Sequence, residues 1–106
     1  MGGKAKVRII NLSSELGRYL LTRNSIKAIF NQINSSKEDE FLIDFINVDF
    51  ISRSCADEYL NEKKDTYKRI TERNQNEYIK KMFRIASKSD NRISFSNKNR
   101  DDIIII

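Results

Sequence analysis

The sequence has no histidine, and its 106 residues include only one cysteine and three glycines. Without histidine, the chain lacks the most frequent general base and the most frequent metal ligand of proteins. The single thiol, Cys55, can build neither an internal disulfide nor a thiolate zinc site. Two of the glycines stand at positions 2 and 3, so no glycine-rich phosphate loop is present. We therefore expect no catalytic residues, no metal site and no cofactor, and we predict that the chain is not an enzyme.

Long apolar runs are missing as well. No stretch approaches the length of a transmembrane helix, and the N-terminal segment MGGKAKVRII lacks the apolar core of a secretory signal. A lone cysteine is typical of proteins in a reducing compartment. These absences predict a cytoplasmic protein that does not associate with a membrane.

Charged residues, in contrast, make up 33% of the chain, and the formal net charge is +5. A positive balance favours acidic partners. The basic residues are scattered along the chain, however, and the adjacent pairs at positions 63–64 and 80–81 stand close to acidic residues. Binding of nucleic acid is therefore the alternative function, and it predicts an affinity that falls steeply as salt is raised.

Apolar residues recur at helical spacing in three segments, 23–33, 52–64 and 77–87, which alternate with strand-like segments at 6–12, 40–46 and 66–72. This order predicts a small α/β domain in residues 1–87, with a mixed sheet of about four strands covered by three helices. Residues 88–106 are polar and end in DDIIII. We expect a C-terminal tail that is either disordered or an edge strand, and pairing of Ile103–Ile106 with a second copy would give a homo-oligomer.

One segment resembles a known family. Residues 42–60, LIDFINVDFISRSCADEYL, are similar to the signature of a STAS-like family catalogued as a domain of unknown function. Further similar segments are GRYLLTRNSIKAIF, with Gly17, Leu20 and Arg23 at the matching positions, and NQNEYIKKMFRIA, so that the resemblance covers residues 7–86. Within residues 42–60 the matching positions are Asp44, Phe45, Val48, Ile51, Ser54, Ala56, Asp57 and Glu58, and Cys55 stands where the family usually has phenylalanine.

The resemblance implies a STAS-like fold and a regulatory module that binds another protein. The wider STAS domains include bacterial anti-sigma factor antagonists, in which a serine at a helix N-terminus is phosphorylated by a partner kinase of the ATPase fold. In this chain the matching position falls on Arg53, between Ser52 and Ser54. The expected partner is accordingly an ATPase- or kinase-fold regulator.

The strand-to-helix junction at residues 49–58 is the candidate site, with Ser52, Arg53, Ser54, Asp57 and Glu58 as its residues. In the simplest interpretation Ser54 caps the helix, with Asp57 completing a capping box. In the functional interpretation, free backbone N–H groups and Arg53 bind a partner's anionic group, or a phosphate placed on Ser52 or Ser54. For Asp57 and Glu58 the simplest interpretation is that their negative charges, in the first turn of the helix, complement the helix dipole.

Arg23 is the last candidate of the site. It follows Thr22, the expected cap of the preceding helix, and a cation in a first helical turn opposes the helix dipole. Arg23 is therefore either a solvated arginine at the helix start or the partner of a specific negative group, such as Asp44, Asp57 or a bound anion.

Overall fold

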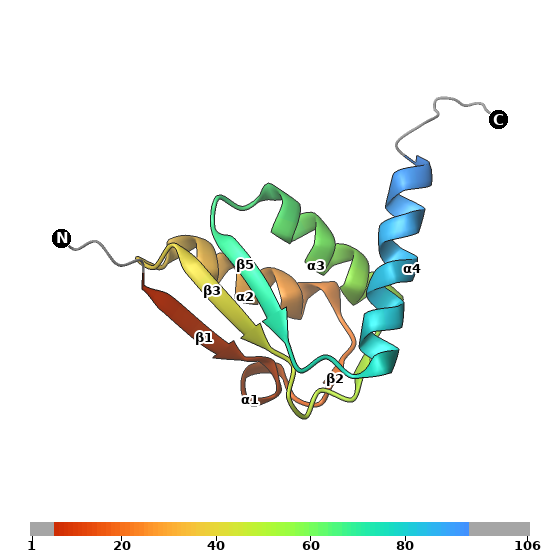
Figure 1. Ribbon diagram of the computed structural model, residues 1–106, viewed down its shortest axis with the longest axis horizontal. Helices are drawn as coiled ribbons and strands as arrows, with labels where there is room; N and C mark the ends of the chain where they lie inside the picture. Colours follow the sequence, from red (N-terminus) through yellow and green to blue (C-terminus); the bar gives the residue numbers. More distant parts are fainter. Residues whose placement is uncertain (1–5, 94–106) are drawn as a thin grey trace.

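The computed structural model describes residues 6–93, and the side chains of residues 6–88. These residues form an α/β fold of five strands and four helices (Figure 1). The elements in chain order are β1 (Val7–Asn11), α1 (Leu12–Leu16), β2 (Tyr19–Leu20), α2 (Arg23–Ser35), β3 (Glu40–Asp44), β4 (Phe50–Ile51), α3 (Arg53–Asp65), β5 (Arg69–Arg73) and α4 (Glu77–Ile93).

The main sheet has the order β1-β3-β5, and all its strands are parallel. β2 and β4 form a separate parallel pair. The α/β class is thus confirmed, but the prediction of one mixed sheet of about four strands under three helices is wrong for the described residues. The physical reason is that every connection between paired strands contains a helix, which returns the chain to the end at which the previous strand began.

Helices α2 and α3 lie side by side on one face of the main sheet, and α4 packs against α3 and β4 (Figure 1). The core between the sheet and these helices contains Phe30, Phe41 and Phe45, which are fully buried. Tyr59 of α3 meets Phe30 and Phe45 edge to face, with ring centroids 5.3 and 6.0 Å apart. Edge-to-face aromatic pairs stabilise by about 1 kcal/mol beyond their buried area, so this cluster holds α3 firmly against the sheet.

Asp44, at the end of the central strand β3, is a buried acid with several partners. Its carboxylate accepts hydrogen bonds from the Asn74 side chain at 3.0 Å and the Ile46 N–H at 2.9 Å, and it pairs with Arg73 at 3.0 Å. The Asn74 hydrogen bond, the Ile46 N–H and Arg73 together hold the pKa of Asp44 below its ordinary value. Asp44 therefore joins the loop after β3 to the end of β5, and does not bind Arg23.

Helix α4 continues to Ile93, across the expected boundary between residues 87 and 88. Residues 88–93 contain neither glycine nor proline, so nothing in their local chemistry ends the helix. The expected edge strand at Ile103–Ile106 lies outside the described residues. None of the helices within residues 6–93 is both long enough and apolar enough to cross a bilayer.

Candidate functional site

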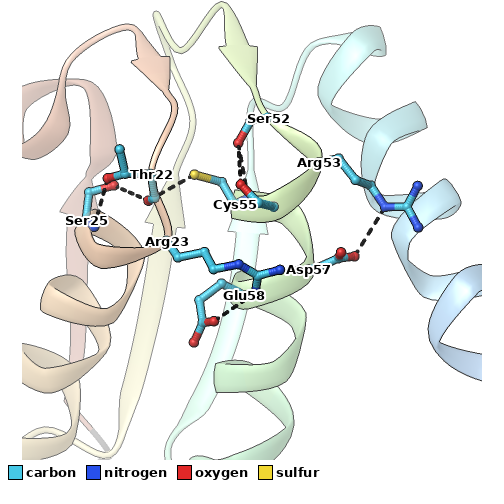
Figure 2. Close-up of polar contacts among 9 residues, drawn as sticks. Thr22, Arg23, Ser25, Ser52, Arg53, Cys55, Asp57 and Glu58 are labelled. Atoms are coloured by element: carbon cyan, nitrogen blue, oxygen red, sulfur yellow. Dashed lines mark hydrogen bonds and ion pairs between the residues drawn. The ribbon is translucent and has the colours of Figure 1, made fainter. Parts of the chain in front are cut away.

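The short strands β2 and β4 bring the starts of α2 and α3 together. Tyr19 pairs with Phe50, and Leu20 pairs with Ile51. The pairing continues to the junction, where the Ser52 N–H donates to the Leu20 carbonyl at 2.9 Å. Because each strand leads into a helix within three residues, the N-termini of α2 and α3 lie next to each other (Figure 2).

Ser52, not Ser54, is the N-cap of α3. Its hydroxyl oxygen accepts a hydrogen bond from the Cys55 N–H at 3.1 Å and lies 3.2 Å from the Leu21 carbonyl, to which it donates. The helix begins two residues earlier than a Ser54 cap requires, because Ser52 is the residue that is still extended at the end of β4. Asp57 consequently lies too far along the helix to complete a capping box, and that expectation is wrong.

Ser54 occupies the second helical position of α3 and is half-buried. Its hydroxyl lies 3.2 Å from the Ser52 hydroxyl. The structure thus brings the two junction serines together but gives them different tasks. Ser52 holds the helix start, whereas Ser54 contacts the cap from the side.

Cys55 is fully buried between the two junctions. Its thiol lies 3.0 Å from the Thr22 carbonyl, to which it donates (Figure 2). Burial raises the pKa of this thiol above its ordinary value, although the Ser52 hydroxyl and Arg23 act in the opposite direction. A thiol held protonated and away from solvent is a packing residue that joins the two helix starts.

Arg23 crosses from α2 to α3 and pairs with Glu58, with 3.2 Å between guanidinium and carboxylate (Figure 2). Glu58 is only 8% exposed, whereas Arg23 is about half exposed. The expected partners Asp44 and Asp57 are wrong, because Asp44 pairs with Arg73 and Asp57 with Arg53. A buried carboxylate needs a cation, and this pairing explains why an arginine is tolerated in the first turn of α2.

Arg53 behaves differently. It pairs with Asp57 of its own helix at 3.3 Å, is exposed, and points toward α4 (Figure 2). An exposed pair four residues apart on a helix stabilises by only about 0.3–0.5 kcal/mol. The guanidinium therefore lies at the exposed surface of the junction.

Three aromatic residues beside the junction were not identified from the sequence. Phe50 and Tyr78 are stacked, with ring centroids 5.3 Å apart and an interplanar angle of 19°, and the Tyr78 hydroxyl donates to the Ile51 carbonyl at 3.3 Å. Tyr19 lies beside Phe50 across the β2–β4 pair and is exposed. No local pattern could have revealed this cluster, because its members come from three distant segments of the chain.

Within the described residues, no group of three histidine, cysteine, aspartate or glutamate side chains is placed to hold a metal ion. Comparison of the chain with protein-family models, with curated proteins and with solved structures found no match.

Proposed function

We propose that this chain is a non-enzymatic, cytoplasmic STAS-like regulatory module that binds a protein partner through the junction at residues 49–58. The observation that supports this proposal is the position of Arg53, which lies exposed at the N-terminus of α3. Its equivalent on α2, Arg23, is bound to the buried Glu58. An exposed positive charge at a helix start that favours anions is suited to recognition of an acidic group.

The partner class proposed from the family resemblance is an ATPase- or kinase-fold regulator, and Ser54 is the better phosphate acceptor of the two serines. Phosphate on Ser52 would remove the cap of α3, since the Ser52 hydroxyl holds the Cys55 N–H. Phosphate on Ser54 would lie in the first turn of α3, where the helix dipole and the adjacent Arg53 stabilise a negative charge. The new charge would also repel an acidic partner group and so release the complex.

The test of the proposed site begins with the partner itself. The tagged protein is used to purify bound proteins from its native cells at moderate salt, and the partner is identified by mass spectrometry. Affinity is then measured by calorimetry for the wild type, for Arg53→Glu, and for Lys37→Glu, which makes the same charge change in the exposed α2–β3 loop.

We expect Arg53→Glu to weaken binding at least tenfold, because it reverses a charge at the interface. Lys37→Glu should bind as the wild type does, and thermal unfolding should show that both variants are folded. Equal affinity of all three proteins would reject the junction as the binding site.

The proposed phosphate switch is tested separately. With the same partner, Ser54→Glu should lower affinity about tenfold through its added charge, whereas Ser54→Ala should bind normally. Incubation with ATP and the partner should give a phosphopeptide that contains Ser54. Transfer of phosphate to Ser52 alone, or normal binding by Ser54→Glu, would contradict the assignment.

A further inference from the structure

An apolar surface lies directly beside the junction. It consists of Tyr19, Leu21, Phe50 and Tyr78, which we call the aromatic patch. Tyr19 and Leu21 are 60% and 59% exposed, and Tyr78 is 38% exposed. Tyr19 and Leu21 lie two residues apart on the extended chain that enters α2, with the buried Leu20 between them, so both point away from the core. Such a concentration of exposed aromatic and aliphatic side chains is unusual on a surface that contacts nothing.

The aromatic patch continues along α4. Ile85, which is 38% exposed, follows Tyr78 by two helical turns and lies on the same side of the helix. The inward side of α4 is occupied by Ile79 and Ala86, both buried in the core. The C-terminal half of α4 extends away from the sheet and from α3, which leaves its outer side open (Figure 1).

Cations accompany this apolar line. Lys81, Arg84 and Lys88, which we call the basic stripe, are exposed and recur at spacings of three and four residues on the outer side of α4. Among the side chains that the structure describes, none forms an ion pair with these three residues. Arg53 adds a further positive charge, because its side chain points toward α4 (Figure 2).

We infer that the aromatic patch and the basic stripe together dock an acidic amphipathic helix of the partner protein, an inference that rests on the proposed function. The apolar side of such a helix would cover Tyr19, Leu21 and Tyr78, and its carboxylates would face Lys81, Arg84 and Lys88. Exposed tyrosines beside arginine and lysine are typical of the centre of a protein interface and its charged rim. The basic stripe spans about 10 Å along α4, which corresponds to about two turns of a docked helix.

The same surface suits nucleic acid less well. Bases bind by stacking on free aromatic faces, but Phe50 and Tyr78 stack on each other, and the Tyr78 hydroxyl is bound to the Ile51 carbonyl. Leu21 and Ile85 offer no ring for a base. An apolar helix side can use all four of these side chains.

The test is a selection that does not require the natural partner. A displayed library of random peptides of about sixteen residues is selected on the full chain, and an enriched peptide is synthesised and measured by fluorescence anisotropy. We expect enriched peptides to carry aspartate or glutamate together with apolar residues at spacings of three and four.

Two variants and one control then locate the binding. The double variant Tyr19→Ser with Tyr78→Ser and the triple variant Lys81→Glu, Arg84→Glu, Lys88→Glu should each bind the peptide at least tenfold more weakly. The control Lys6→Glu, Lys37→Glu, Arg69→Glu has the same net charge as the triple variant and changes exposed cations at the opposite end of the sheet, so it should bind normally. Circular dichroism melting establishes that each variant is folded.

Enrichment of peptides without acidic residues, binding that neither variant weakens, or tighter binding of an oligouridine RNA of about twelve nucleotides would overturn the docking surface. Failure of the proposed function is a separate result. If Arg53→Glu leaves the purified partner's affinity unchanged while the patch variants reduce it, the docking surface stands and the junction does not. The reverse result would retain the junction and reject the docking surface.

Discussion

The two strand-to-helix junctions of this protein are built alike but are used differently. In each, a two-residue strand leads to an oxygen-bearing cap, Thr22 or Ser52, and an arginine is the first residue of a helix of 13 residues. Arg23 reaches across to Glu58 of the neighbouring helix, whereas Arg53 pairs within its own helix. The same local chemistry therefore gives a structural ion pair at one helix start and a surface charge at the other.

The difference comes from what each helix start faces. α2 begins beside α3, where the buried carboxylate of Glu58 requires a cation. The side chain of Arg53, in contrast, is exposed, pairs with Asp57 and points toward α4. An exposed charge at a helix start is accessible to other molecules, whereas the Arg23–Glu58 pair is partly buried between two helices.

The largest expected difference between the junctions concerns their caps. Ser52→Ala should destabilise the protein by about 1–2 kcal/mol, because it removes both the hydrogen bond to Cys55 and the link to β2. Thr22→Ala should cost about 0.5–1 kcal/mol, because the Thr22 hydroxyl holds only the exposed Ser25 N–H. Urea unfolding of both variants measures the difference. Equal losses would show that the two caps contribute alike.

Replacement of the two arginines by alanine should lower the free energy of unfolding by smaller amounts than loss of the Ser52 cap does. Arg23→Ala leaves Glu58 without its cation and should destabilise by about 1 kcal/mol, a value reduced because Arg23 is half exposed to solvent. Arg53→Ala removes an exposed pair and should cost about 0.3 kcal/mol. Denaturant titrations in low and high salt measure both values. A larger loss from Arg53→Ala would mean that Arg53, not Arg23, holds the fold.

The smallest expected effect concerns Glu62, which follows Glu58 by one helical turn. Burial, followed by the hydrogen bond and charge of Glu58, raises the pKa of Glu62 above its ordinary value of 4.5. A raised pKa means that the folded state binds this proton more tightly than the unfolded state does. The stability that this tighter proton binding contributes is present below pH 4.5 and is lost as pH rises through the folded-state pKa of Glu62.

Glu62→Gln should therefore stabilise the protein at pH 8 by about 0.3 kcal/mol, the usual cost of two like charges four residues apart on a helix. At pH 4 the variant should match the wild type. Thermal melts across this pH range measure the effect. An advantage of the variant that is equally large at pH 4 would exclude repulsion between the two carboxylates as its cause.

Much of the secondary structure could be predicted locally. The segments expected to be helical at 23–33 and 52–64 correspond closely to α2 and α3, because both have an oxygen-bearing cap and an apolar side at helical spacing. The strands β2 and β4, which pair with each other, could not be predicted, since a two-residue strand has no periodicity. For the same reason the sequence favours Ser54 as the cap of α3, although the extended end of β4 makes Ser52 the cap.

The α/β class, the helices α2, α3 and α4, the strands β1, β3 and β5, and an arginine between two serines at the start of α3 could all be read from the sequence. These properties depend on residues close together in the chain, whose spacing expresses backbone geometry directly. That Arg23 binds Glu58, and that Tyr19, Phe50 and Tyr78 form one surface, follows from the packing of the folded chain. Such contacts join distant segments, and they form only when the packing of the sheet and helices brings those segments together.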